Sequence, residues 1–326
     1  MYCCNFQMKY SVIILGCIIC LVSACTKKKE SQPEPQTAIT LNDVTYGNAT
    51  NFIGNTQPLL MDIYKPIGNE NTKPLILFIH GGAFLFGNKN EAIDLCKFYV
   101  QKEFVAVSIN YRLGWKFGTN NCDGDMSSLK KAAYRGLQDT HAALRYLVAN
   151  AKTYNIDTSK IFIGGASAGG VLALQTAYLD KKDIIANFPN FDKEFGKVYT
   201  SGNNLTTTFS IKGVVNIWGG IFDLGIISEN EKIPIISFHG TNDTVVPYDN
   251  GTYAGCANYL PIFGSKAIYD LLQNRNVSSV LHSQIGGGHG VYNASYIANN
   301  GYCFIKNILA NNKVSGAYNN LISRCE

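Results

Sequence analysis

The sequence lacks several features that would place it in other protein classes. Charged residues make up only 16% of its 326 residues and hydrophobic residues 46%, which excludes disorder over most of the length, because such a chain buries enough apolar surface to offset its ordering entropy. The formal net charge of +5 is small, and no clustered basic surface indicates a nucleic-acid partner. No internal repeat occurs. Simple division of the length suggests two domains, but one large α/β domain of this size is common, and we expect one core.

The N-terminal apolar run is too short for a permanent transmembrane helix. Ser11 to Cys25 is uncharged and apolar, and a polar stretch follows at once, which is typical of an export signal. Val22-Ser23-Ala24-Cys25 resembles a bacterial lipobox. We therefore expect a lipoprotein signal peptide over residues 1–24 and lipidation of Cys25, which would attach the protein to a membrane of the bacterial cell envelope. An ordinary cleaved signal or a signal anchor is the alternative.

The segment after the lipobox has the composition of a tether. Residues 25–38 contain almost no apolar side chains and two prolines, so the catalytic domain is expected to span residues 39–326. No CxxC pair or Cys/His cluster in the mature chain indicates a metal site, and we expect no cofactor. The spacing leaves the disulfide pairing open among Cys96, Cys122, Cys256, Cys303 and Cys325. A bridge from Cys303 to Cys325 is one expectation.

Short apolar runs alternate with longer stretches of helical spacing. The runs expected to form strands are Leu59 to Tyr64, Pro74 to Ile79, Phe104 to Ile109, Lys160 to Ile163, Ile211 to Ile217, Ile233 to Phe238 and Val280 to Ile285. The first reads as an antiparallel edge strand, and the last reads as the final strand of the sheet. Helices are expected at Lys130 to Thr153, Val171 to Leu179 and Lys266 to Gln273. This alternation predicts a mostly parallel sheet with helices on both faces.

Two stretches fit neither pattern. They are Trp115 to Ser128 and Asp183 to Ser210. The second carries four aromatic residues among polar ones, so it is either a small cap over a site or an excursion packed on itself.

A nucleophile motif lies between an expected strand and an expected helix. Gly165-Ala166-Ser167-Ala168-Gly169 is a G-x-S-x-G sequence in the strand-to-helix context that a nucleophile elbow requires. The turn lifts the Ser167 hydroxyl to the carboxyl edge of the sheet, where open α/β folds bind ligands. A serine hydroxyl is a weak nucleophile, so the motif demands a base and an acid that orients the base.

Both groups occur downstream in the order Ser, Asp, His. Asp243 lies just past the strand that ends at Phe238, and His289 follows the last expected strand within GGGHG. The other histidines have less suitable places: His141 in a helix, His282 in a strand, His239 at a strand end where a structural hydrogen bond is expected, and His80 in a loop that it braces. Asp223 is the competing acid.

Donors for an oxyanion are expected after the strand that ends at Ile79. His80-Gly81-Gly82-Ala83 has the form of an HGGG-type motif, whose backbone amides bind a developing oxyanion. Small side chains are needed there because larger ones would block the carbonyl under attack. We assign Gly82, Ala83 and Ala168 as the donors, each typically worth about 3 kcal/mol of transition-state stabilisation.

With these motifs the chain resembles the carboxylesterase and hormone-sensitive-lipase-like branch of the α/β-hydrolases. The matching segments include LLMDIYKP, FIHGGAFLFGNK, SINYRLGW, GLQDTHAALRYL, SFHGTNDTVVPY and GGGHG, from about Leu59 to His289. The resemblance implies an α/β-hydrolase fold and a structural ion pair between Arg112 and Asp139. The chain departs from it at Ala166, where type-B carboxylesterases usually carry Glu, and at Ala83 in place of the third glycine.

The resulting hypothesis is a serine carboxylesterase that acts on short-chain acyl esters of glycans or small metabolites. Asp183 to Ser210 offers no long apolar helix of the kind that covers an interfacial lipase site, which favours short acyl chains. A catalytically silent binding module on the same fold is one alternative, although its usual sign is a lost nucleophile. A peptidase of the prolyl-oligopeptidase kind is another, although the chain has no room for the accessory domain of that family.

Overall fold

The computed structural model describes residues 38–68, 71–120 and 122–322, all of which belong to one compact unit. The predicted signal peptide, Cys25, nearly all of the predicted tether and Cys325 lie outside the described residues. The expectations for them, including the bridge from Cys303 to Cys325, stay predictions. Within the described ranges no helix is both long and apolar enough to cross a bilayer.

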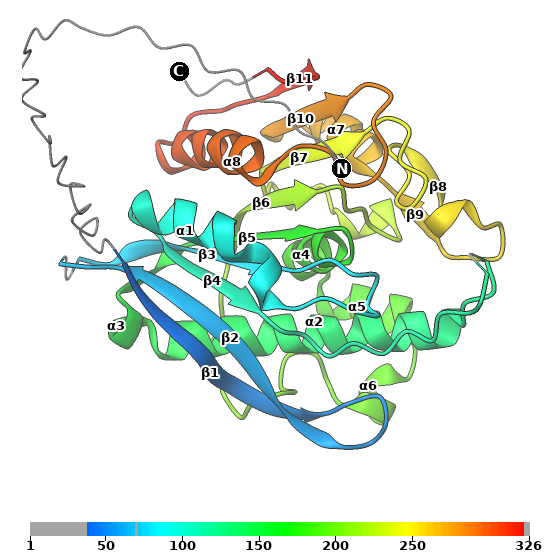
Figure 1. Ribbon diagram of the computed structural model, residues 1–326, viewed down its shortest axis with the longest axis horizontal. Coiled ribbons are helices and arrows are strands. Elements are labelled where there is room, and N and C mark those ends of the chain that lie inside the picture. The colour runs from blue at the N-terminus through cyan, green and yellow to red at the C-terminus, as the bar shows by residue number, and fades with distance from the viewer. Residues whose placement is uncertain (1–37, 69–70, 121, 323–326) are drawn as a thin grey trace, which may run out of the picture. The chain divides into compact units, whose positions relative to one another are not determined.

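A nine-stranded sheet forms the centre of the unit, in the order β1-β2-β4-β3-β5-β6-β7-β10-β11 (Figure 1). The pairs β1–β2 and β2–β4 are antiparallel, and the pairs from β4 to β11 are parallel. These strands are β1 (Ala38–Thr50), β2 (Thr56–Pro66), β3 (Lys73–Ile79), β4 (Val105–Ile109), β5 (Ile156–Ala166), β6 (Ile211–Ile217), β7 (Ile235–Gly240), β10 (Ser279–Gln284) and β11 (Gly316–Asn319). A separate hairpin pairs β8 (Asn250–Thr252) with β9 (Pro261–Phe263).

Helices cover both faces of the sheet. The helices are α1 (Ile93–Gln101), α2 (Met126–Ala149), α3 (Ala151–Tyr154), α4 (Ala168–Tyr178), α5 (Lys181–Asn187), α6 (Phe191–Phe195), α7 (Ser265–Asn274) and α8 (Ala294–Leu309). Alternate residues of β3 supply the two cores: Leu75 and Leu77 pack with α2 and α4, and Ile76 packs with α1 and α8. A strand buried on both faces reads as a continuous apolar run, which is why the sequence indicated β3.

The predicted architecture of a mostly parallel sheet with helices on both faces is confirmed, but its edges differ from the prediction. Leu59 to Tyr64 lies inside β2, which pairs with β1 and β4 and is therefore not an edge strand. Val280 to Ile285 falls largely in β10, which is followed by the edge strand β11. The edge strands β1 and β11 were not predicted from the sequence. Much of each strand is exposed, so neither shows a continuous apolar run.

The segment from Asp183 to Ser210 packs along α2. The rings of Phe188, Phe191 and Phe195 lie 5.3, 5.4 and 6.3 Å from that of Tyr134, whose hydroxyl donates to the Gly196 carbonyl at 2.8 Å. Among the described residues, no hydrogen bond or ring contact joins this segment to Ser167, Asp243 or His289. The segment is thus tied to α2 by its aromatic side chains.

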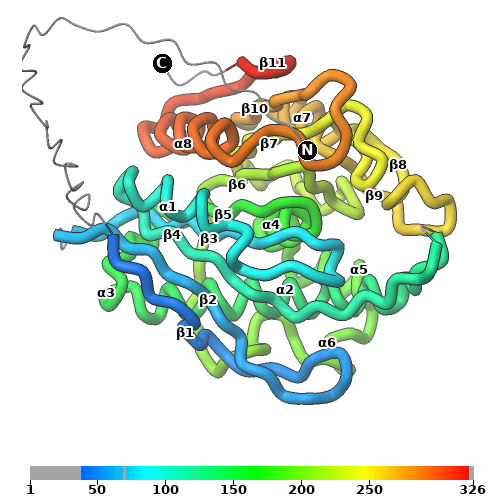
Figure 2. The backbone as a smooth tube through the Cα atoms, in the orientation of Figure 1, coloured from blue at the N-terminus to red at the C-terminus, as the bar shows by residue number. Residues whose placement is uncertain are grey.

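The other irregular stretch, Trp115 to Ser128, is held by a disulfide. Cys122 is bonded to Cys256, 134 residues later in the chain, and the two loops meet near the right of Figure 2. Two hydrogen bonds add to this link, from Asn258 Nδ2 to the Cys122 carbonyl at 2.9 Å and from the Gly124 amide to Tyr259 Oη at 2.6 Å. The free cysteine of the described residues is Cys96, which is buried.

Candidate active site

The strand order brings the two loops with glycine-rich motifs together. β3 and β5 are parallel neighbours, with Ile79 opposite Gly165, so the segments after them leave the same edge of the sheet. The chain goes from β3 to β4 on one side and then crosses to β5 on the other, which makes this edge a topological switch point. Ligand sites in open α/β sheets lie at such points.

Ser167 occupies the turn between β5 and α4. Its φ of 53° and ψ of −118° are unusual for a residue other than glycine, which is the strained conformation of a nucleophile elbow. The turn needs a glycine at position 169, because a Cβ there would lie 2.1 Å from the Ile79 carbonyl oxygen. This close approach seats the start of α4 against the end of β3.

The structure brings Ser167, His289 and Asp243 into one hydrogen-bonded chain. Ser167 Oγ lies 2.9 Å from His289 Nε2, and His289 Nδ1 lies 2.7 Å from Asp243 Oδ2. Since a carboxylate only accepts, Nδ1 carries the proton and Nε2 faces the serine as an acceptor. This is the arrangement in which imidazole removes the serine proton.

Hydrogen bonds of the backbone hold the loop that carries His289 against the loop that follows β7. The Asn242 amide donates to the Gly287 carbonyl at 2.8 Å, and the Gly286 amide donates to Thr241 Oγ1 at 2.9 Å. Gly240 permits this approach, because a Cβ there would lie 2.3 Å from the carbonyl oxygens of Gly287 and Gly288. The loops after β7 and β10 therefore pack as one layer.

Asp243 is held in its charged form by several donors. Its side chain is fully buried, and Oδ1 accepts from the amides of Val245 and Val246 at 2.8 and 3.0 Å. Burial by itself raises the pKa of Asp243, but hydrogen bonds from His239 and His289 outweigh it and hold the pKa well below its usual range. The carboxylate is therefore ionised at neutral pH.

His239 contacts the same carboxylate, a role that the sequence did not indicate beyond a structural hydrogen bond. Its Nε2 lies 3.1 Å from Asp243 Oδ2 and 2.9 Å from the Val246 carbonyl oxygen. Both partners accept, so Nε2 carries the proton and Nδ1 accepts from Ser265 Oγ at 2.7 Å. His239 is completely buried, and its place in HGTND, four residues before Asp243, was the available signal.

The loop after β3 offers backbone amides beside the serine. A Cβ on Gly81 would lie 3.5 Å from Ser167 Cβ, so the two segments are in contact. Among the described residues no acceptor is found for the amides of Gly82 and Ala83. The Ala168 amide opens α4, where no intrahelical acceptor exists. All three amides are thus available to an oxyanion.

His80 braces this loop without reaching the serine. Its ring stacks on Tyr111 at 4.3 Å, and the Tyr111 hydroxyl donates to the Gly81 carbonyl at 3.0 Å. Burial lowers the pKa of His80, which keeps the imidazole neutral. Gly82 then closes a turn by accepting from the amides of Leu85 and Phe86.

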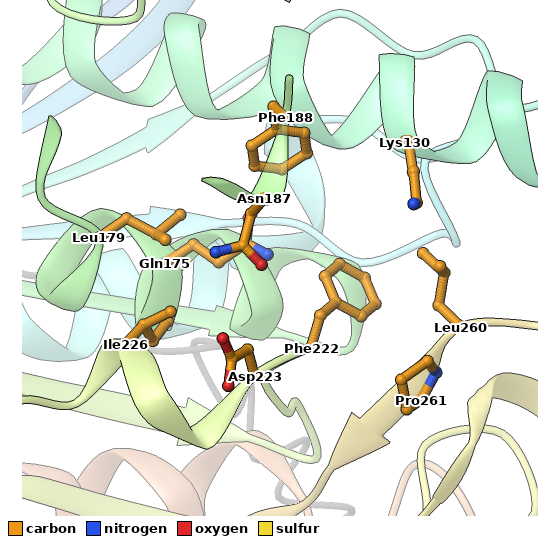
Figure 3. Close-up of a pocket in the computed structure, with 10 residues that line it drawn as sticks. All are labelled: Lys130, Gln175, Leu179, Asn187, Phe188, Phe222, Asp223, Ile226, Leu260 and Pro261. Carbon is orange, nitrogen blue, oxygen red and sulfur yellow. The ribbon is translucent and has the colours of Figure 1, made fainter. Parts of the chain in front are cut away.

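Asp223, the competing acid, lies elsewhere. Its Oδ1 accepts from the Gly225 amide at 2.8 Å at the start of a short 3₁₀ helix, Leu224–Ile226. Figure 3 shows its side chain in a pocket of about 220 Å³ with Gln175, Asn187 and Phe222, and no triad residue lines that pocket. Its exposed carboxylate has no hydrogen bond to His289.

Arg112 and Asp139 form the ion pair that the resemblance implied. Arg112 Nη2 lies 2.7 Å from Asp139 Oδ1, and both side chains are buried. A further bond from the Arg112 backbone amide to Asp139 Oδ2, at 2.7 Å, ties the segment after β4 to α2. No group of three or more His, Cys, Asp or Glu side chains in the described ranges is placed to hold a metal ion.

Comparison with known proteins extends these observations. This chain is 40% identical to venom carboxylesterase-6 from Apis mellifera over 129 residues. It is 34% identical to para-nitrobenzyl esterase from Bacillus subtilis (strain 168) over 116 residues. These matches cover 39% and 35% of this chain but 21% and 23% of the relatives. The chain thus matches about a fifth of the length of such curated relatives.

Solved structures show the same fold at low identity. A truncated carbohydrate esterase from gut microbiota has a TM-score of 0.57 and 20% identity, with 85% of this chain and 99% of that one covered. Apo Thermogutta terrifontis esterase 2 has a TM-score of 0.53 and 19% identity, with coverage of 85% and 94%. The predicted α/β-hydrolase fold is thereby confirmed.

The family profile described as BD-FAE matches residues 61–233, more than half of the chain. The match includes Ser167 and the loop from His80 to Ala83, whereas Asp243 and His289 lie beyond it. The chain belongs to the BD-FAE family.

Proposed function

We propose that the protein is a serine carboxylic-ester hydrolase that works through an acyl-enzyme. The observation that carries this proposal is the chain of short hydrogen bonds from Ser167 through His289 to Asp243. The amides of Gly82, Ala83 and Ala168 beside the serine support it, because ester cleavage needs donors for the oxyanion. The similarity to named esterases points to the same reaction class.

In the acylation step Ser167 Oγ attacks the ester carbonyl carbon while its proton passes to His289 Nε2. The tetrahedral oxyanion is held by the amides of Gly82, Ala83 and Ala168. Its collapse breaks the bond to the alkoxy oxygen, which takes the proton from His289 and leaves as the alcohol. Asp243 keeps the imidazole in the required tautomer and stabilises its charged form.

Deacylation repeats this path with water. His289 Nε2 accepts a proton from a water molecule as the water oxygen attacks the acyl carbon. Collapse of the second tetrahedral intermediate breaks the bond between the acyl carbon and Ser167 Oγ, which takes the proton back from His289 Nε2. The products are a carboxylic acid and the free enzyme. The same groups therefore act as base and acid in turn.

A fluorophosphonate probe tests the nucleophile directly. The wild type should become labelled at Ser167, and Ser167→Ala should lose both the label and about a million-fold in kcat while staying folded, because the hydroxyl contributes little to the core. The structure offers Ser108→Ala as a buried serine control, which should still be labelled at Ser167. Label on a serine other than Ser167 would refute the assignment.

For the substrate we propose short-chain acyl esters, from acetyl to butyryl, of a glycan or a small metabolite. Asp183 to Ser210 supplies only the short helices α5 and α6, and α6 packs on α2. Among the structural neighbours, one is described as a carbohydrate esterase and another holds propionate. With p-nitrophenyl esters, kcat/KM should rise and then fall within a short series, because each methylene adds about 0.8 kcal/mol only while pocket wall remains. A continued rise to decanoyl esters would contradict a short acyl pocket.

We also propose that Cys25 is lipidated and attaches the protein to a membrane of the bacterial cell envelope. The support is the lipobox-like Val22-Ser23-Ala24-Cys25 and the tether composition that follows it. Mass analysis of the N-terminal peptide should show lipid on the wild type and none on Cys25→Ser. A mature wild-type peptide without lipid mass would rule out this attachment.

A further inference from the structure

A groove distinct from the pocket of Asp223 lies on the surface of the unit. Its volume is about 500 Å³, and it is enclosed by the turn between β1 and β2, by α2 and by the residues around α6. These three segments lie together at the lower edge of Figure 1. Its lining includes Asn48, Thr50, Phe52, Arg135, Phe195 and Ser201. Neither Ser167, Asp243 nor His289 lines it.

Arg135 is the unusual residue of this groove. Its side chain extends from α2, and the residue is only 5% exposed. The buried Nε has no hydrogen-bond partner, and no carboxylate of the described residues lies within ion-pair distance of the guanidinium. The guanidinium lies over the ring of Phe195, whose centroid is 5.8 Å from Cζ, and its Nη2 packs against Gly114. A buried N–H group without an acceptor is costly, because it has lost water without gaining a hydrogen bond, and here the cost falls on Nε of a charged group that has no counter-ion.

The nearby acidic groups are already engaged. Asp139 is bound to Arg112 through both of its oxygens. Glu194 also lines the groove but pairs with Lys131 at 3.1 Å, and both of those side chains are well exposed. The balance leaves one uncompensated positive charge, that of Arg135, at the floor of the groove.

We infer that this groove binds a carboxylate-bearing ligand through Arg135. A guanidinium offers two parallel N–H donors whose spacing matches the two oxygens of a carboxylate. A single negative charge balances the single uncompensated positive one, which favours a carboxylate over a dianionic phosphate. The side chains of Asn48, Thr50 and Phe52 provide polar and aromatic surface for the rest of the ligand.

This site is independent of the proposed esterase reaction, so its test does not measure activity. Thermal unfolding is followed at constant ionic strength while sodium acetate replaces sodium chloride, with inorganic phosphate as the comparison anion. Acetate at ten times its Kd should raise the Tm of the wild type by about 3 °C. Phosphate at equal ionic strength should raise it less.

Two variants at the site and one matched control identify the residue responsible. Arg135→Met should remove the response to acetate and should not lower the Tm measured in chloride, since it deletes an unpaired buried charge. Arg135→Lys keeps the charge but not the paired donors, and its Kd for acetate should be at least about tenfold higher. Lys130→Gln removes an exposed charge of α2 that does not line the groove, and it should respond as the wild type does.

Three results would overturn the inference. The first is a wild type whose Tm does not distinguish acetate from chloride. The second is a response that persists in Arg135→Met, which would place the anion elsewhere. The third is an equal or larger response to phosphate that depends on Arg135, which would exclude the preference for a carboxylate.

Discussion

Ser167 Oγ and His289 Nε2 lie 2.9 Å apart although 122 residues separate them in the chain. Neither residue is placed by its own loop alone. Ser167 depends on the contact of Gly169 with the end of β3, and His289 depends on the approach of Gly287 to Gly240. The length of this hydrogen bond therefore depends on how the ends of four strands pack. Substitutions that change this packing should change the rate of the reaction.

Substitution of Asp243 and of Asp223 should show which of the two is the acid that orients His289. Asp243→Asn presents an amide to His289 and favours the wrong imidazole tautomer, so kcat should fall by about four orders of magnitude. Asp223→Asn changes an exposed helix cap and should leave kcat within about twofold. Ester hydrolysis by the purified variants measures both, and the opposite ranking would assign the acid to Asp223.

His239 should position Asp243 without touching substrate. His239→Leu removes the donor to Asp243 Oδ2, and we expect kcat to fall about tenfold to a hundredfold with KM little changed. His239→Gln, which keeps a donor, should recover much of the loss. The matched control is His282→Leu, because His282 is also buried and lies on the neighbouring strand β10, where it bonds to Tyr296 Oη at 2.8 Å. Equal losses of kcat in the two leucine variants would indicate a general packing defect.

The disulfide between Cys122 and Cys256 should stabilise the fold. It closes a loop of 134 residues, for which chain entropy gives about 5 kcal/mol. The double variant Cys122→Ser/Cys256→Ser should lower the free energy of unfolding by up to that amount. Denaturant unfolding measures the loss, with Cys96→Ser as the control for a buried cysteine outside the bridge. An unchanged unfolding free energy in the double variant would show that the hydrogen bonds of Asn258 and Gly124 suffice.

His141 should make the protein sensitive to acid. Burial first, and then the nearby charge of Arg145, lower the pKa of His141 to about 3, and its Nε2 has no partner. Below the ordinary histidine pKa of about 6.5, the unfolded chain takes up a proton that the folded protein refuses. Stability from this site is therefore lost as the pH falls, by about 1.4 kcal/mol per pH unit between the two pKa values.

The variant His141→Leu should lack this dependence. The difference in unfolding free energy between variant and wild type should be constant above pH 7.5 and should move in favour of the variant between pH 6 and about 4. Denaturant unfolding at a series of pH values measures it. A difference that stays constant over the whole range would show that His141 becomes protonated in the folded state.

The sequence by itself determined the elements whose signals are local. A turn is indicated by the small residues within two short segments, Gly165 to Gly169 and His80 to Ala83. This signal lies within each segment and does not depend on a neighbouring strand. Buried parallel strands such as β3 are apolar along their whole length, so they were found as continuous runs. The order of Ser167, Asp243 and His289 along the chain indicated a triad, because successive strand ends meet at one edge of a parallel sheet.

Only the tertiary structure decided which distant groups meet. β1 and β11 were missed because edge strands expose many of their side chains and carry no continuous apolar run. The pairing of Cys122 with Cys256 depends on where two long loops come to lie, which spacing cannot predict. The sequence around His239 and Arg135 does not indicate their roles. In the folded protein His239 contacts Asp243, and the buried Nε of Arg135 has no acceptor. Tertiary packing decides which polar groups are buried next to one another.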